Sequence, residues 1–248
     1  MRIVLAGAFC SAFLISVALV LIVRKAALKW GLMDHPGGRK QHAGATPLGG
    51  GLAIFLAVSL PVLGAGLLSC FLQRNPSLFP AFEPLREDIA RAATRLPVLL
   101  KILAGGLAIA LLGLWDDLRT FSPSKKLLGQ FIIAGAVALI PEVRITLFIH
   151  VAWVQVVVTM VWIVLMVNSF NLLDNMDGQS GLVAFLTGGV LLVLALQTGQ
   201  YFIAGLLLAL LGAVLGFLLF NLPPASIFMG DMGSMFIGYV LAIATTLA

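Results

Sequence analysis

Long apolar runs make up most of this sequence, and they constrain its fold more than any other feature. Eight such runs lie at residues 3–23, 49–72, 97–115, 127–140, 148–167, 181–197, 201–220 and 232–248. A helix needs about 20 residues to cross a bilayer, and only a helix or a closed barrel satisfies its backbone hydrogen bonds in lipid. We therefore predict an all-α, polytopic membrane bundle of about eight transmembrane helices, in which residues 1–248 form a single integral-membrane domain.

The composition agrees with lipid around the outside of the molecule. Charged residues are 10% of the chain and hydrophobic residues 61%, whereas a soluble domain carries about a quarter charged residues. The net charge of +5 does not indicate nucleic-acid binding, because no long basic stripe is present. Cys10 and Cys70 both lie in apolar runs, so we expect small buried side chains and no disulfide framework.

The basic residues around the first apolar run predict the topology. Arg2 precedes this run, and Arg24, Lys25 and Lys29 follow it. The positive-inside rule then places the N-terminus outside. Four connecting segments are expected on the cytoplasmic side, at residues 24–48, 116–126, 168–180 and 221–231. The segment 73–96 falls outside, where we predict a helix lying on the outer surface.

Six of the ten acidic residues fall in these four inner segments: Asp34, Asp116, Asp117, Asp174, Asp177 and Asp231. Clustered carboxylates repel one another unless a cation holds them, and oxygen ligands of this kind suit Mg²⁺ or Mn²⁺. No Cys/His set has zinc spacing. Basic side chains on the same side could bind phosphate oxygens: Arg39, Lys40, Lys125 and Lys126. Carboxylates, a divalent cation and basic groups together indicate phosphoryl transfer.

Each of these features is weak by itself, and two other functions are kept open. An Asp-Asp pair can be an ordinary polar helix end, Lys125 and Lys126 can be topology anchors, and His42 can be a loop histidine. An ion-coupled secondary transporter would place its acids near the middle of the membrane and show an internal repeat. An inactive fragment or scaffold would keep the motifs without turnover. The convergence of four segments on one side favours an enzyme.

Four motifs in order resemble a known family. They read D-H-P-G-G-R-K-Q-H with P-L-G-G-G, D-D-L-R-T-F-S-P with K-K, N-S-F-N-L-L-D-N-M-D-G, and N-L-P-P-A-S-I-F-M-G-D-M-G-S. Together they resemble the polyprenyl-phosphate N-acetylhexosamine-1-phosphate transferases of glycosyltransferase family 4, the superfamily that contains phospho-MurNAc-pentapeptide translocase. The match runs from about Asp34 to Gly238. The chain is short at its C-terminus relative to this family.

The resemblance implies a reaction and a role for each matched residue. A lipid phosphate, undecaprenyl phosphate or a similar polyprenyl phosphate, would attack a UDP-sugar at the cytoplasmic face of the bacterial inner membrane and release UMP. Mg²⁺ would be the cofactor, with Mn²⁺ as an alternative. The implied metal ligands are Asp231 and Asn171, and the implied catalytic residues are Asp116, Asp117 and Asp174. The implied substrate-binding residues are Asp177, Asn168, Lys125, Lys126, Arg39, Lys40 and His42.

The resemblance implies a place in cell-wall or other polysaccharide biosynthesis, and a homodimer is one alternative for the oligomeric state. Nucleic acid is not an expected partner.

Overall fold

The chain forms an all-α bundle in the computed structural model, which describes residues 2–34, 45–75, 80–119, 121–146 and 150–247. The described residues contain eight α-helices: α1 Arg2–Trp30, α2 Gly50–Arg74, α3 Arg86–Leu118, α4 Pro123–Ala138, α5 Ala152–Leu173, α6 Gln179–Gln197, α7 Tyr201–Asn221 and α8 Gly230–Leu247. Each helix overlaps one of the eight apolar runs, so the predicted fold class is confirmed.

Seven of the described helices are long and apolar enough to cross a membrane, and α4 is the exception. It has 16 residues. At 1.5 Å per residue it is about 24 Å long, which is shorter than a hydrocarbon core of about 30 Å. The shortest predicted run is therefore a helix as expected, but one that reaches less far than its neighbours.

The outer segment 73–96 differs from the prediction in one respect. A short 3₁₀ turn, η2 Pro80–Leu85, leads directly into α3, which continues through Pro97 without a break. The predicted surface helix is thus the first part of α3 rather than a separate element. Proline removes the N–H that would bond the carbonyl of Ala93, and the thiol of Cys70 lies 3.8 Å from that oxygen and donates to it.

The two cysteines are free thiols, as predicted, but they are less buried than expected. Cys10 is exposed on α1 and Cys70 is partly buried. The expectation of burial was wrong because an apolar run in a membrane bundle places many of its side chains on the outer surface, toward lipid.

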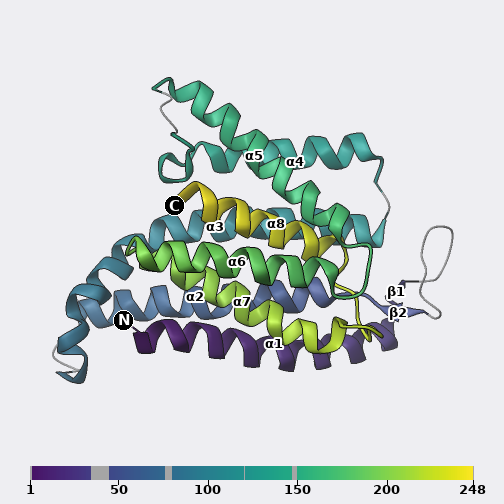
Figure 1. Ribbon diagram of the computed structural model, residues 1–248, viewed down its shortest axis with the longest axis horizontal. Helices are drawn as coiled ribbons and strands as arrows, with labels where there is room; N and C mark the ends of the chain where they lie inside the picture. The colour runs from purple at the N-terminus through teal and green to yellow at the C-terminus, as the bar shows by residue number, and fades with distance from the viewer. Residues whose placement is uncertain (1, 35–44, 76–79, 120, 147–149, 248) are drawn as a thin grey trace.

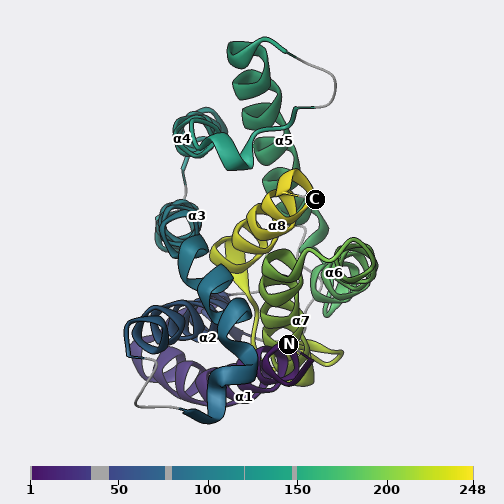
Figure 2. The ribbon, with the colours of Figure 1, turned by 90° about the vertical axis from the view of Figure 1, so that its left-hand side faces the viewer.

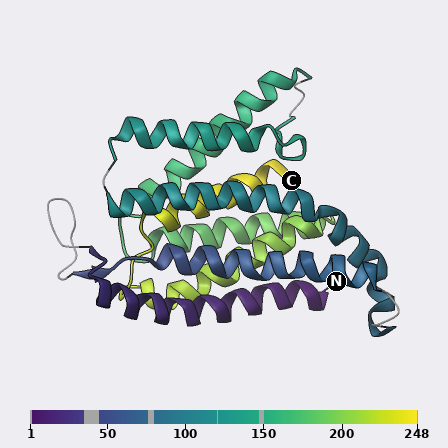
Figure 3. The ribbon, with the colours of Figure 1, turned by 180° about the vertical axis from the view of Figure 1, so that it is seen from behind.

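The connecting segments with acidic residues meet at one end of the bundle, which we call the site end. Figures 1 and 3 show the last turns of α1, α3, α5 and α7 and the first turns of α2, α4, α6 and α8 at this end. Successive helices thus alternate in direction through the bundle. The described parts of the four inner segments lie together as predicted, and both chain termini lie toward the opposite end (Figure 1).

Two short strands at the site end join the first inner segment to the last one. Strand β1, Met33–Asp34, pairs antiparallel with β2, Thr46–Pro47. The N–H of Phe228 donates to Pro47 O at 2.9 Å, and the N–H of Gly50 donates to Phe228 O at 2.9 Å. The segment before α8 is therefore fixed to the start of α2.

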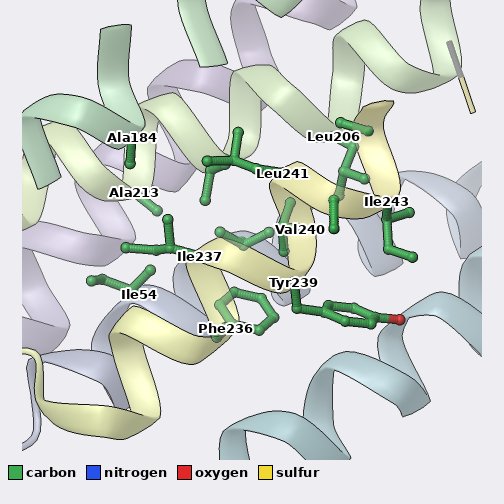
Figure 4. Close-up of a cluster of buried hydrophobic side chains, with 14 of the residues drawn as sticks. Ile54, Ala184, Leu206, Ala213, Phe236, Ile237, Tyr239, Val240, Leu241 and Ile243 are labelled. Carbon is green, nitrogen blue, oxygen red and sulfur yellow. The ribbon is translucent and has the colours of Figure 1, made fainter. Parts of the chain in front are cut away.

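Helix α8 lies inside the bundle, where Figure 2 shows it among α3, α5, α6 and α7. Residues 232–244 are all buried. Figure 4 shows Phe236 and Tyr239 directed to one side of α8, and Ile237 and Leu241 to the other. The Tyr239 hydroxyl donates to Ile102 O of α3 at 2.8 Å.

Glycines allow three neighbouring helices to reach the backbone of α8. A Cβ at Gly51 of α2 would lie 2.7 Å from Gly233 Cα, and one at Gly113 of α3 would lie 2.6 Å from the carbonyl carbon of Asp231. A Cβ at Gly238 would lie 2.6 Å from Met166 O of α5. Small residues at such crossings permit close packing in membranes, where dispersion replaces the hydrophobic effect as the driving force.

Helices α1 and α7 pack by the same principle. A Cβ at Gly216 of α7 would lie 2.8 Å from Phe13 O, and one at Gly212 would overlap the carbonyl oxygen of Phe9. The Ser16 hydroxyl donates to Ala213 O at 2.6 Å across this contact. The small-xxx-small pattern at 212–216 is therefore the contact surface of α7 with α1.

Candidate active site

The N-terminus of α8 is held by an acidic residue from another helix. Asp117 lies in the last turn of α3, and its Oδ1 accepts the N–H of Asp231 at 2.8 Å. Its Oδ2 accepts the N–H of Met232 at 3.1 Å. Gly230 turns the chain into α8 with φ at 68°, and a Cβ there would lie 2.6 Å from Asp117 Oδ2. A glycine is thus required for Asp117 to approach this closely.

The side chain of Lys126 lies among three oxygens from three other helices. Its Nζ is 2.9 Å from Asp116 Oδ2 of α3 and 3.1 Å from Asn171 Oδ1 of α5, and it also donates to Asp231 Oδ2 of α8. These contacts use all three ammonium protons. The side chains of Lys126 and Asp116 are 14% and 12% exposed, so water screens their attraction only weakly.

Asn171 connects α5 to the start of α8. Its Nδ2 donates to Asp231 Oδ1 at 2.8 Å and to Ser234 Oγ at 3.0 Å. Ser234 is fully buried, and its hydroxyl donates to Gly230 O at 3.1 Å. The amide thus has its nitrogen fixed by Asp231 and Ser234, which leaves its oxygen directed at Lys126.

Asp116 also stabilises the turn between α3 and α4. Its Oδ1 accepts the N–H of Phe121 at 2.6 Å while Oδ2 pairs with Lys126. The ring of Phe121 in turn lies 5.3 Å from that of Trp115. Ser122 is the N-cap of α4, and Lys126 follows it by about one helical turn. The turn between α3 and α4 therefore places Lys126 beside the acids.

Asp174 follows the last residue of α5 and lies near the same acids. Burial, and to a lesser extent the negative charges of Asp231 and Asp117, raise the pKa of this carboxyl from 3.8 to about 7. Among the described residues, these acids outnumber the one lysine that contacts them, and such an excess of carboxyl groups favours the binding of a further cation.

Asp177 and Asn221 fix the segment between α5 and α6 to the segment before α8. Asp177 Oδ2 accepts the N–H of Ala225 at 2.9 Å. Asn221 Oδ1 accepts the N–H of Gly178 at 3.1 Å, and its Nδ2 donates to Ile227 O at 2.9 Å. Asn221 is buried, and its two hydrogen bonds join the two segments inside the protein.

The structure brings together six of the nine described residues that the sequence assigns to the site. Five of them form what we call the acid cluster together with Lys126: Asp116, Asp117, Asn171, Asp174 and Asp231. Lys125 is exposed, and among the described residues no hydrogen bond or ion pair joins its side chain to these acids. Asn168 contacts Gln130 and Val164 instead. Arg39, Lys40 and His42 lie outside the described residues.

Sequence reasoning missed Ser234, Asn221 and Gln130. Ser234 ends the motif G-D-M-G-S, and Asn221 begins N-L-P-P-A-S, so both stood inside quoted motifs without a role. Gln130 is the only amide or charged residue in its apolar run, 127–140, and this isolation was the available signal.

The oxygens around Lys126 fit the chemistry of a hard cation. Among the described residues, no three His, Cys, Asp or Glu side chains are placed to hold a metal ion by themselves. The amide oxygen of Asn171 and the carboxylates of Asp231 and Asp116 already surround one positive charge, that of Lys126. Carboxylate and amide oxygens are ligands that Mg²⁺ accepts, usually together with water and substrate phosphates.

Comparisons with known proteins identify the relatives of the chain. A family model described as Glycosyl transferase family 4 matches residues 99–248. The probable undecaprenyl-phosphate N-acetylglucosaminyl 1-phosphate transferase of Bacillus subtilis is 32% identical over 95% of this chain and 62% of its own length. The undecaprenyl-phosphate alpha-N-acetylglucosaminyl 1-phosphate transferase of Yersinia pestis is 30% identical, over 92% of this chain and 58% of its own length.

A second group of relatives carries a different name. The phospho-N-acetylmuramoyl-pentapeptide-transferase of Bacillus cytotoxicus is 30% identical over 95% of this chain and 72% of its own length. The chain spans less than two thirds of the length of the Bacillus subtilis and Yersinia pestis relatives.

Proposed function

Because this chain belongs to glycosyl transferase family 4, we propose that it transfers an N-acetylhexosamine 1-phosphate from a UDP-sugar to undecaprenyl phosphate and releases UMP. The observation that carries the proposal is the position of Lys126 between Asp116, Asn171 and Asp231 at the ends of three helices. The names of the relatives, which join polyprenyl phosphates to amino-sugar phosphates, support this choice of substrates.

The proposed reaction exchanges one phosphorus–oxygen bond for another. An oxygen of the lipid phosphate attacks the phosphorus that carries the sugar, and the bond from this phosphorus to the UMP oxygen breaks. The products are UMP and a polyprenyl diphospho-sugar. A phosphate monoester has its second pKa near 6, so the attacking group is already ionised at neutral pH and needs no strong base. The acids are then required mainly to orient groups and balance charge.

The residues of the acid cluster have separate tasks in this proposal. The positive charge of Lys126 stabilises the negative charge that spreads over the transferring group. Asp117 fixes the first turn of α8 and with it Asp231. Asn171 orients Asp231, and Asp116 orients Lys126. Asp231 and Asn171 would hold Mg²⁺, which when bound neutralises phosphate charge and orients the diphosphate.

The first and third inner segments would complete the nucleotide side of the site. Arg39, Lys40 and His42 belong to the segment between β1 and β2, and Asp177 to the segment clasped by Asn221. We propose that these four residues face the UDP moiety and that the site end faces the cytoplasm. Arg24, Lys25 and Lys29 in the last two turns of α1 support that orientation.

A transfer assay tests the proposed function. Purified protein in lipid nanodiscs receives undecaprenyl phosphate and a UDP-N-acetylhexosamine labelled in the sugar, with Mg²⁺ or with EDTA. We expect labelled lipid and an equal amount of UMP, in the presence of Mg²⁺ only. The absence of both products with each UDP-N-acetylhexosamine tried would overturn the proposal. Sodium- or proton-driven uptake of a solute into proteoliposomes, without these products, would support the transporter alternative.

A further inference from the structure

Helix α4 supplies Lys126 but lies at the edge of the bundle. Its described neighbours are chiefly α3, α5 and the 3₁₀ turn η3, Pro141–Val143. Figure 2 shows α4 beside α3 and α5 and set apart from α8, which carries Asp231. The meeting of Lys126 with Asp231 therefore depends on how α4 is seated against α5.

A second polar contact joins these two helices one turn farther from the site end. Gln130 lies four residues after Lys126 and so on the same face of α4, and it is fully buried. Its Oε1 accepts a hydrogen bond from Asn168 Nδ2 at 2.6 Å. Asn168 precedes Asn171 by three residues on α5. The pairs Lys126–Asn171 and Gln130–Asn168 are thus successive contacts along one α4–α5 interface.

The direction of this second contact is fixed by the backbone of α5. Asn168 Nδ2 also donates to Val164 O at 2.8 Å. A carbonyl oxygen can only accept, so the Asn168 nitrogen is the atom on this side, and Gln130 has to present its oxygen to it. The rotation of α4 that satisfies this bond is the rotation that directs Lys126 to Asn171.

Folding stability alone does not explain the contact between Gln130 and Asn168. The Nε2 group of Gln130 is buried and has no hydrogen-bond partner among the described residues. An unpaired buried donor is unfavourable, whereas a methionine would fill the same space without one. The presence of a glutamine at position 130 is therefore better explained by the hydrogen bond that its oxygen accepts from Asn168 than by a contribution of the side chain to folding stability.

We propose that Gln130 is a positioning residue which, through Asn168, sets the rotation of α4 on α5 and keeps the Lys126 ammonium in the acid cluster. The turnover part of the proposal rests on the proposed function, because Lys126 acts there on the transferring phosphate. The placement of Lys126 itself does not, and it can be measured without substrate.

The first test compares the chemical reactivity of two adjacent lysines. Protein with Gln130→Met and wild-type protein are treated with a limiting amine-acylating reagent, and the acylation of Lys126 is measured by mass spectrometry against that of exposed Lys125. Because Lys126 is held by three oxygens in the wild type, we expect slow acylation there and at least several-fold faster acylation in the variant. An unchanged Lys126-to-Lys125 ratio would overturn the proposal.

The second test measures turnover and stability together. For Gln130→Met we expect kcat to fall on the order of 10- to 100-fold, KM for the UDP-sugar to change much less, and the Tm to stay level or rise. The exchange Gln130→Asn with Asn168→Gln restores an amide pair of the same total length, and we expect it to recover most of kcat. A kcat loss accompanied by an equal loss of Tm, with no recovery in the exchanged pair, would show a merely structural role.

Thr159→Val is the matched control for loss of a polar contact in α5. Thr159 is fully buried at the opposite part of that helix, where its hydroxyl donates to Gln155 O at 2.7 Å and accepts the N–H of Ile145 at 2.9 Å. We expect this variant to lower the Tm and leave kcat and Lys126 acylation unchanged. If the wild-type protein makes no product, the proposed function fails, and the acylation test still decides the role of Gln130.

Discussion

Asp117 of α3 holds the helix that carries Asp231. Its two carboxylate oxygens accept the N–H groups of Asp231 at 2.8 Å and Met232 at 3.1 Å, which are among the four N–H groups that a helix start leaves without internal partners. Asp117 therefore uses its carboxylate to support the helix start that carries Asp231, and not as a free ligand. The adjacent pair Asp116 and Asp117 has divided roles, because Asp116 pairs with Lys126.

Replacing Asp117 should therefore affect folding as well as turnover. Asp117→Ala leaves two largely buried N–H groups unpaired, and we expect a stability loss of about 1–3 kcal/mol together with loss of product. Thermal unfolding in nanodiscs measures the first effect and the transfer assay the second. Glu142→Ala, which removes an exposed acid at the opposite end, serves as the control and should leave both unchanged. A loss of turnover in Asp117→Ala at full wild-type stability would contradict the supporting role.

Asp231 should be needed for the response to Mg²⁺. Asp231→Asn keeps the size of the side chain but removes the charge that pairs with Lys126 and would hold the metal. We expect no Mg²⁺-dependent product and a loss of the Mg²⁺-induced rise in Tm. Asp88→Asn, at the start of α3 near the other end, should behave as the wild type. Product formation equal to that of the wild type in Asp231→Asn would exclude the metal role.

Lys126 and Lys125 should differ sharply although they are adjacent. Lys126→Met removes the one cation that lies among the acids in the described part of the chain, and we expect turnover to fall on the order of 100-fold or more. Because the acids then lack a partner, added Mg²⁺ should raise the Tm of this variant more than that of the wild type. Lys125→Met should stay within a few-fold of wild-type turnover. Equal losses of turnover in Lys126→Met and Lys125→Met would contradict a special role for the lysine that lies in the acid cluster.

The charge of Asp174 should make the metal-free protein less stable as the pH rises. Burial and the nearby acids raise the pKa of Asp174 from 3.8 to about 7, so the folded state holds this proton more tightly than the unfolded chain. Its stabilising effect is complete below pH 4 and is lost as the pH rises to 7. Asp174→Asn cannot ionise. In EDTA we expect its gain in Tm over the wild type to grow between pH 4 and 7 and to level off above that; a gain independent of pH would contradict the assignment.

The glycine contact between α2 and α8 should be intolerant of even one methyl group. A Cβ at Gly51 would lie 2.7 Å from Gly233 Cα, and backbone cannot move aside as a flexible side chain can. We expect Gly51→Ala to cost at least the 1–3 kcal/mol typical of overpacking and to reduce turnover, because α8 shifts. Gly64→Ala on the same helix is the control, since a Cβ there meets nothing within 4 Å. Equal Tm values for the two variants would contradict this account of the packing.

The fold was largely predictable because lipid imposes a simple requirement on sequence. Every passage through the bilayer has to be apolar and helical, so the eight runs located the eight helices. The continuity of the predicted surface helix with the rest of α3 was missed because Pro97 is typical of a helix boundary, yet a helix can continue through a proline when another group reaches the freed carbonyl. The pairing of β1 with β2 was also missed, because two-residue strands are too short to show a period.

The acid cluster was predictable as a group of residues but not as a set of contacts. Four segments at one end of a bundle bring their acids together whatever the details. Which lysine reaches them depends on the rotation of α4, since consecutive helix residues point about 100° apart. The same rotation of α4 turns Gln130 toward Asn168 of α5, while Asn171, about one turn later on α5, meets Asp231. Neither direction can be read from composition or spacing.

The glycine crossings of α8 determine which part of the molecule is free to respond during turnover. Three neighbouring backbones touch this helix at Gly51, Gly113 and Gly238, so it has little room to tilt or slide. In the proposed reaction, we therefore expect the movements of substrate entry and product departure in the peripheral α4 and in the links between helices, while the position of the Asp231 carboxylate stays constant.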